Sequence, residues 1–179
     1  MALLDLDLDV RLIQPGDRLT GLSLGDAEFT PLKTFLQRYA HDYERQSLAR
    51  TYAAFRPEPQ KVVGYITLVC GEVVTDDGDA CLIEGVDYRY RQYPAVKIAR
   101  LAVDKSLQRK TGLGRHLVDL ALGTARDVIC PSVGCRFVMV ESKKAAVKFY
   151  EKCGFTMLDT PANKERSEPV MFVDLSKAA

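Results

Sequence analysis

Residues 97–129 read KIARLAVDKSLQRKTGLGRHLVDLALGTARDVI, and this stretch decides the fold. Its first seven residues are rich in apolar and β-branched side chains and are followed by Asp104, which predicts a strand. A polar turn comes next, and Gly112 and Gly114 stand where a helical pattern begins. The apolar stripe of that pattern is formed by Leu113, Leu117, Leu120, Ala121, Thr124 and Val128. The segment therefore predicts a strand that leads through a glycine-bearing turn into an amphipathic helix.

The turn is suited to binding a diphosphate. The first N–H groups of a helix have no partner inside it, and the helix dipole places partial positive charge there. Glycine at 112 and 114 lets the backbone approach an anion closely, and Arg109, Lys110 and Arg115 add formal charge. The alternative is an ordinary strand–turn–helix with a glycine cap, because glycine doublets are common in turns. The basic flanks favour phosphate binding.

Two well-known phosphate loops are missing from the sequence. No G-x-x-x-x-G-K-[ST] occurs, and G-x-G-x-x-G is excluded because residue 117 is leucine. The chain instead carries R-x-x-G-x-G at 109–114, after a strand that reads RLAVD at 100–104. This pattern resembles the acyl-CoA signature, [R/Q]-x-x-G-x-[G/A], of the GNAT N-acetyltransferase superfamily. Residues 146–155, AVKFYEKCGF, resemble the second block of the same superfamily, A-x-x-F-Y-x-x-x-G-F.

The resemblance implies where an acyl-CoA would bind. In the superfamily, backbone groups of the strand before the loop hold the pantetheine arm and polarise the thioester, and the loop amides hold the diphosphate. Carried over by motif, the cofactor-binding residues are Leu101, Ala102, Val103, Arg109, Lys110, Thr111, Gly112, Leu113, Gly114, Arg115, Ala146 and Phe149. Lys110 replaces a frequent glycine and adds charge near phosphate. Lys143 replaces a frequent asparagine that contacts the cofactor, so that one contact is not expected here.

Tyr150 matches the tyrosine that often serves as general acid in this superfamily. A tyrosine has a reference pKa of about 10 and a thiol one of about 8.5, so Tyr150 is protonated at neutral pH and can hand a proton to a departing thiolate. The alternative is a core tyrosine on an amphipathic helix. The sequence does not identify the general base: Glu72, Glu84 and Glu141 are candidates, and an ordered water is another.

The composition is typical of an ordinary soluble protein. The chain has 179 residues, 47% hydrophobic and 27% charged, and a net charge of +1, which argues against a strongly basic nucleic-acid binder. Five cysteines form no C-x-x-C and lie among apolar residues, so we expect reduced core cysteines and no metal site. The acidic N-terminus is unlike a signal peptide, and no apolar run approaches 18 residues. We expect a cytoplasmic protein without a membrane span.

The rest of the chain alternates strands and helices. One helix is expected from Thr30, as its cap, to about residue 46, with Pro31 at its first position. A second is expected over 143–152, closed by Gly154. Strands are expected at 10–13, 49–55, 61–70, 80–84, 135–140, 155–158 and 170–175, with turns at 57–59 and 76–79. This pattern predicts one α/β domain over residues 1–179, a single-domain GNAT-like fold with a mixed central β-sheet flanked by helices.

Residues 86–93, VDYRYRQY, alternate aromatic and basic side chains. In a strand, Tyr88 and Tyr90 would share one face and Arg89 and Arg91 the other. Such a rim could stack bases and contact phosphates, although an edge strand or a subunit contact explains the pattern equally simply. The candidate substrate residues are Tyr88, Arg89, Arg91, Lys143 and Lys144.

A narrower resemblance covers roughly residues 30–158: the chain is similar to the GNAT toxins of bacterial toxin–antitoxin pairs. Those proteins acetylate the α-amine of aminoacyl-tRNA by direct attack on acetyl-CoA, are often homodimers, and bind a ribbon-helix-helix antitoxin. The resemblance implies the same donor, acceptor and partners here. Two alternatives stay open: an N-acetyltransferase for a small-molecule or protein amine, and a catalytically silent acyl-CoA-binding module. Loops outside the cofactor motif choose the acceptor, so the motif does not identify it.

Overall fold

A computed structural model describes residues 7–57, 60–75 and 88–177. Its contacts divide the chain into two compact units, residues 1–69 with 98–121 and residues 70–97 with 122–179. The strands β3 (Lys61–Val74) and β4 (Gln92–Val103) pass through both units. The seven strands follow the order β1-β2-β3-β4-β5-β7-β6 in a mixed sheet, as the sequence predicted for an α/β fold. The prediction of one domain over residues 1–179 stays a prediction.

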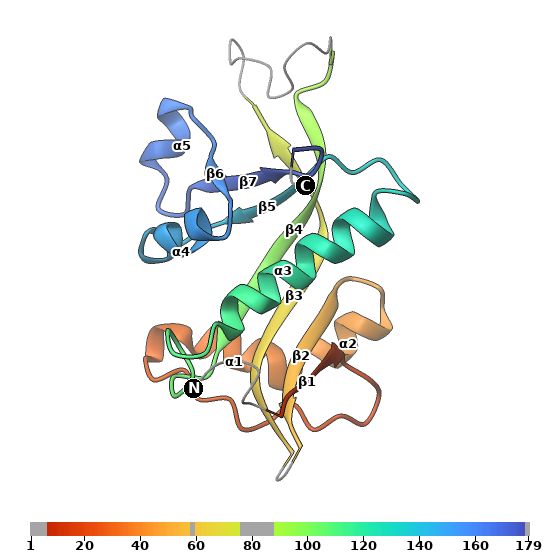
Figure 1. Cartoon of the computed structure of the whole chain (residues 1–179), viewed down its shortest axis with the longest axis vertical. Helices are drawn as coiled ribbons and strands as arrows, with labels where there is room; N and C mark the ends of the chain where they lie inside the picture. Colours follow the sequence, from red (N-terminus) through yellow and green to blue (C-terminus); the bar gives the residue numbers. More distant parts are fainter. Residues whose placement is uncertain (1–6, 58–59, 76–87, 178–179) are drawn as a thin grey trace. The chain divides into compact units, whose positions relative to one another are not determined.

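The first unit contains an antiparallel arrangement of β1 (Asp9–Leu12), β2 (Arg50–Arg56) and β3 (Figure 1). The helix α3 (Leu113–Thr124) also begins in this unit and buries Leu113, Leu117, Val118 and Ala121. The core of the unit is aromatic around Phe35, whose ring stacks on Tyr65 and carries the Arg100 guanidinium 3.7 Å above it. The Tyr65 hydroxyl donates a hydrogen bond of 2.7 Å to the Leu32 carbonyl, which ties the first helix to β3.

The helix predicted from residue 30 to about 46 is divided in the structure. It comprises α1 (Thr30–Arg38) and α2 (Ala40–Arg45), separated by Tyr39, whose φ of −120° is not helical. Thr30 is not the cap that the sequence suggested. A 3₁₀ turn, η2 (Ala27–Phe29), precedes α1, and the Asp26 side chain caps it by accepting a hydrogen bond from the Glu28 amide. A better cap lies earlier in the chain, so the helical segment begins earlier.

The second unit contains β5 (Phe137–Glu141), β6 (Thr156–Met157) and β7 (Val170–Asp174). The β5 strand pairs in parallel with Ala95–Lys97 of β4 and antiparallel with β7, and β6 lies on the other side of β7 (Figure 1). Two short helices complete the unit, α4 (Val147–Lys152) and α5 (Pro161–Glu165). The helix predicted over 143–152 begins as a 3₁₀ turn, η4 (Lys144–Ala146), and Gly154, with φ +91°, ends it as predicted.

Two further predictions need correction. The central helix continues beyond α3 as a π-helical turn, η3 (Ala125–Ile129). The wider turn changes the phase of the side chains, so Ala125 is buried while Val128 of the predicted apolar stripe is 63% exposed. Cys70 is exposed and therefore not a core cysteine, whereas Cys153 is buried. The predicted strand at 80–84 and the turn at 76–79 lie outside the described residues, as does most of the turn at 57–59.

Within the described part of the chain, every helix falls short of the length and hydropathy that a bilayer span requires.

Candidate active site

The loop after β4 is fixed at its start by Asp104, a carboxylate that is only 2% exposed. It accepts hydrogen bonds from the Ser23 amide at 2.9 Å and from the amide and hydroxyl of Ser106 at 3.0 and 2.7 Å. Burial by itself would raise the pKa of Asp104, but the hydrogen bonds from Ser106 and Ser23 outweigh it and hold the pKa below its usual value. The residue that the sequence marked as the end of a strand is thus the anchor of the predicted phosphate loop.

Two residues of this loop have a left-handed backbone conformation: Arg109, with φ +60°, and Gly112, with φ +76°. No atom lies within 4 Å of a Cβ placed at Gly112, so a side chain would have room at this position. Glycine is favoured there because of the left-handed backbone conformation. A left-handed arginine costs about 1–2 kcal/mol. Backbone strain of this kind gathers at functional sites, which agrees with the role predicted for Arg109.

Thr111 caps the start of α3. Its hydroxyl donates to the Leu107 carbonyl at 3.2 Å and accepts from the Leu113 amide at 3.4 Å. The first helical bond runs from the His116 amide to the Gly112 carbonyl. The amide of Gly114 therefore precedes the hydrogen-bond ladder and has no acceptor inside the helix, as an anion site at a helix N-terminus requires.

The predicted cofactor residues of this unit fall into three groups by their exposure to solvent. Thr111, Leu113 and Ala102 are buried, so only their backbone groups can meet a ligand. Arg109, Lys110, Gly112 and Arg115 are exposed, while Leu101, Val103 and Gly114 are half-buried. The Arg115 guanidinium also bonds Asp119 at 3.1 Å on the same helix.

Tyr150 belongs to the second unit and is 6% exposed on α4. Its ring packs edge-on against Phe149 and Phe155, with centroids 5.1 and 5.3 Å away. No hydrogen bond joins its hydroxyl to another residue of the described chain. Burial, with a smaller contribution from Cys153, raises the pKa of Tyr150 above its usual value and keeps the phenol protonated. Ala146 and Phe149, predicted to contact the cofactor, are half-buried on the same segment.

Four of the five predicted substrate residues lie at the surface, and the fifth is half-buried. Arg89, Arg91, Lys143 and Lys144 are exposed. Tyr88 and Tyr90 do contact each other, with centroids 5.7 Å apart, but residues 88–91 precede β4 and do not form the alternating strand that the sequence suggested. The ring of Tyr88 also packs, tilted, against Tyr93 at a centroid distance of 4.9 Å beside the second unit's core, so Tyr88 has a structural role.

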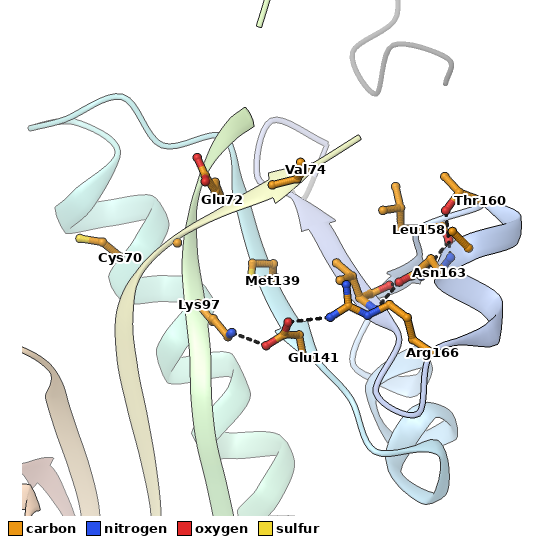
Figure 2. Close-up of a pocket in the computed structure, with 13 residues that line it drawn as sticks. Cys70, Glu72, Val74, Lys97, Met139, Glu141, Leu158, Thr160, Asn163 and Arg166 are labelled. Atoms are coloured by element: carbon orange, nitrogen blue, oxygen red, sulfur yellow. Dashed lines mark hydrogen bonds and ion pairs between the residues drawn. The ribbon is translucent and has the colours of Figure 1, made fainter. Parts of the chain in front are cut away.

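An ion triad that sequence reasoning missed lies in the second unit. The Glu141 carboxylate accepts from Lys97 through one oxygen and from Arg166, at 2.9 Å, through the other (Figure 2). The ion pair with Lys97, aided by that with Arg166, lowers the pKa of Glu141 below its usual value despite partial burial. Glu141, one of three candidate bases, is therefore a weak base. Glu72 is exposed, and Glu84 lies outside the described residues.

The triad borders a cavity of about 610 Å³ within the second unit (Figure 2). Its apolar wall includes the buried side chains of Met139, Leu158 and Val170. The side chain of Asn163 on α5 links the segments around Leu158 and Val170. Its Nδ2 donates to the carbonyls of both residues, and its Oδ1 accepts from the Val170 backbone amide. The sequence did signal α5, because Thr160 and Pro161 form the cap and first-position pair that is typical of a helix start.

The comparisons with known proteins agree with this picture. The Acetyltransferase (GNAT) family matches residues 24–155, which include both sequence blocks, and the chain belongs to this family of acetyltransferase enzymes. No curated protein sequence matches the chain.

Solved structures of toxins have the same fold. A tyrosine-to-phenylalanine mutant of the AtaT toxin is 26% identical, with a TM-score of 0.75 over 95% of this chain and 91% of that one. AtaTR bound with AcCoA is 25% identical, with a TM-score of 0.74 over 95% of each chain. AtaT complexed with acetyl-methionyl-tRNAfMet is 25% identical, with a TM-score of 0.79 over 96% of this chain and 97% of that one. The chain is thus similar in fold to the AtaT toxin along nearly its whole length.

Proposed function

We propose that this protein transfers an acetyl group from acetyl-CoA to the α-amine of an aminoacyl-tRNA. The amine nitrogen attacks the thioester carbonyl, the N–C bond forms, and the C–S bond breaks. The amine loses one proton and the departing CoA thiolate gains one, so the products are the N-acetylated aminoacyl-tRNA and CoA. The observation that carries the proposal is the anion-ready loop, with left-handed Arg109 and Gly112 before the capped start of α3, in a GNAT chain.

The cofactor's diphosphate is proposed to lie on the loop amides around Gly114, with Arg109 and Lys110 supplying charge. Both side chains are exposed, and the Asp104 anchor holds the loop without occupying those groups. The backbone of Leu101–Val103 is proposed to hold the pantetheine arm, as the family motif implies. AtaTR, 25% identical, has been solved with AcCoA, which supports the same donor here.

Tyr150 is proposed as the general acid. Its burial disfavours the phenolate, but a desolvated thiolate is disfavoured in the same way. The reference pKa of a phenol, about 10, lies only a little above that of a thiol, about 8.5, so transfer to the departing thiolate is slightly uphill and stays accessible. An unengaged hydroxyl among apolar rings suits a group that donates one proton to a leaving sulfur.

The tRNA acceptor is supported by the structure of AtaT with acetyl-methionyl-tRNAfMet, at 25% identity. The net charge of +1 means that phosphate contacts must come from a local basic surface. We propose Arg89, Arg91, Lys143 and Lys144 for this role, because all four are exposed in the second unit. By the same resemblance, a small antitoxin and a second copy of this chain are the proposed protein partners.

The test is acetylation of charged tRNA at increasing salt. The purified protein, labelled acetyl-CoA and aminoacyl-tRNA should give N-acetyl-aminoacyl-tRNA, and kcat/KM should fall steeply as salt rises because counterions are released from the backbone. Neutralising residues 89, 91, 143 and 144 should flatten that slope without changing acetyl-CoA affinity. Ready acetylation of polyamines or peptides, with charged tRNA untouched, would refute the tRNA acceptor and favour the small-molecule or protein amine.

A further inference from the structure

Two half-buried cysteines of the second unit, Cys130 and Cys135, stand at the two ends of the loop between η3 and β5. The Cys130 amide closes the π-helical turn through a hydrogen bond of 2.8 Å to the Ala125 carbonyl. Cys135 comes just before β5, which begins at Phe137. Turns of the π type are uncommon and are frequent at functional sites. The end of the central helix therefore presents one thiol, and the start of the next strand presents another.

Hydrogen bonds hold the Cys130 sulfur beside Cys135. The chain turns back after η3, because the amides of Ser132 and Val133 both donate to the Ile129 carbonyl at 2.9 Å. The Cys130 thiol then donates to the carbonyl of Cys135 itself, also at 2.9 Å. The Cys135 thiol donates to the Phe137 carbonyl at 3.6 Å. Thiols are weak donors, so little stabilisation is lost when these hydrogens are removed.

The loop between the two cysteines is open to solvent. Residues 131–134 are all exposed, and Val133 is 62% exposed. No atom lies within 4 Å of a Cβ placed at Gly134, and a glycine has the widest choice of backbone conformations. A small oxidant can therefore reach the half-buried sulfurs, and the loop can adjust to the narrow geometry that a disulfide bond requires.

The environments of the two thiols suit them to different steps. The thiolate is the form of cysteine that attacks an oxidant. Burial raises the pKa of Cys135 above its usual value, and the neighbouring Cys130 thiol adds to the shift, so Cys135 stays protonated at neutral pH. Cys130 is then the residue that reacts first. Cys135, held next to it, is the thiol that reacts with the oxidised sulfur, because proximity compensates for its weak nucleophilicity.

We propose that Cys130 and Cys135 form a reversible redox pair, which a hydroperoxide converts into an intramolecular disulfide. The Cys130 sulfur attacks the peroxide, an S–O bond forms, the O–O bond breaks, and water leaves with the thiol proton. The Cys135 sulfur then attacks the Cys130 sulfenic acid, the S–S bond forms, the S–O bond breaks, and a second water leaves with the Cys135 proton. The two sulfurs together lose two electrons, which the peroxide gains.

The reduced pair that the composition suggested is the resting form in this scheme. A dithiol reductant restores it by two successive thiol–disulfide exchanges. The inference is separate from the acetyl transfer proposed above, because it uses neither the loop at 109–114 nor Tyr150. Failure of either proposal leaves the other unaffected.

The first test is peptide mapping of the folded protein after treatment with hydrogen peroxide and then with an alkylating agent. Trypsin cleaves after Arg126 and Arg136, so both cysteines fall in the single peptide 127–136. This peptide should carry no alkyl group and should be about 2 Da lighter than its reduced form, because two hydrogen atoms are lost. Dithiothreitol should restore both alkylation sites. The yield should not change on tenfold dilution of the protein, since the bond is intramolecular.

The same digest reports the competing outcomes. Cys70 and Cys81 share peptide 62–89, and Cys153 lies in peptide 153–164, so a disulfide to any of these would join two peptides. Such a joined pair in place of the lighter peptide would overturn the inference. Full alkylation of both cysteines after peroxide, or a sulfinic acid on one of them beside a free thiol on the other, would overturn it as well.

The second test separates the two thiols with variants. Cys135→Ser keeps a small side chain that can donate to the Phe137 carbonyl, but it removes the second thiol. The Cys130 sulfenic acid should then persist, and its capture by dimedone should rise by at least about tenfold over the wild type. Cys70→Ser, at an exposed cysteine of the same unit, is the matched control and should form the lighter peptide as the wild type does.

Cys130→Ser serves if Cys135→Ser fails to fold, because its hydroxyl can still donate to the Cys135 carbonyl. In this variant the lighter peptide should be lost, and Cys135 should remain open to alkylation after peroxide. Equal dimedone capture in the wild type and Cys135→Ser would overturn the inference. Loss of the disulfide in Cys70→Ser would also overturn it, because Cys70 would then be a partner in the bond.

Discussion

Leu113 lies directly on Gly64: a Cβ added to that glycine would stand 3.1 Å from the Leu113 Cδ2 atom and 3.3 Å from the Ala102 carbonyl oxygen. The start of α3 therefore rests on β3 at a point where even a Cβ atom would be crowded. Since the predicted diphosphate amides belong to the same helix start, this contact sets where those amides lie within the first unit.

Gly64→Ala should destabilise the fold and weaken acetyl-CoA binding. Overpacking of a well-packed core costs about 1–3 kcal/mol, and the Ala102 carbonyl leaves little room for relief. The measurements are the free energy of unfolding in denaturant and the affinity for acetyl-CoA. Gly123→Ala is the matched control, since the nearest atom to its Cβ is 4.0 Å away and alanine suits a helix better by about 0.8–1.0 kcal/mol. Similar stability changes in the two variants would contradict the contact.

Gly114→Glu should abolish the stabilisation by acetyl-CoA. Ligand at 100 times its dissociation constant stabilises a folded protein by about 2.7 kcal/mol, which thermal unfolding detects. The new carboxylate would place bulk and negative charge where the diphosphate is proposed to bind. Gly134→Glu adds the same group at an exposed glycine with no atom within 4 Å of its Cβ, and it should keep the full thermal shift. An undiminished shift in Gly114→Glu would mean that the cofactor binds elsewhere.

Tyr150→Phe should lower kcat by roughly 10²–10⁴, the usual contribution of general acid catalysis, with acetyl-CoA affinity nearly unchanged. Phenylalanine keeps the packing against Phe149 and Phe155 and removes only the hydroxyl. Tyr39→Phe, at a residue that is 48% exposed in the first unit, serves as the control and should behave as wild type. Turnover within threefold of the parent would refute the acid role.

Asp104→Asn should destabilise the protein at neutral pH by about 1–3 kcal/mol, because an amide group would face backbone and hydroxyl donors that now meet a carboxylate. The folded-state pKa of Asp104 lies below that of the unfolded chain, about 3.9. Its ionised form therefore contributes stability that is fully present above about pH 4 and is lost as pH falls through the folded pKa.

The variant should accordingly show a shallower loss of stability below pH 4 than the wild type, measured by unfolding at a series of pH values. Asp42→Asn breaks an exposed pair with Arg45, whose side chains are 53% and 75% exposed, and should change stability by less than about 0.5 kcal/mol. Parallel pH curves for wild type and Asp104→Asn would show that the buried carboxylate is not the group that titrates.

The sequence by itself determined the elements that local patterns encode. The strand before Asp104, the start of the helix at Leu113, the end of α4 at Gly154 and the closing strand at 170–174 were all predicted within a few residues. Periodicity and glycine conformation are properties of a few neighbouring residues, so they can be read without the fold. The two motif blocks also predicted the GNAT family that the family match shows.

Only the tertiary structure decided the features that join distant segments. The Lys97–Glu141–Arg166 triad joins residues 25 to 69 positions apart, and the Asp104 anchor depends on Ser23, 81 positions away. The break at Tyr39 and the π-helical turn after Thr124 also escaped the periodic pattern, because both change the phase of a helix that the pattern assumes to be regular. Spacing along a chain records which face a side chain shares with its neighbours, but long-range pairing depends on how the strands are ordered in space.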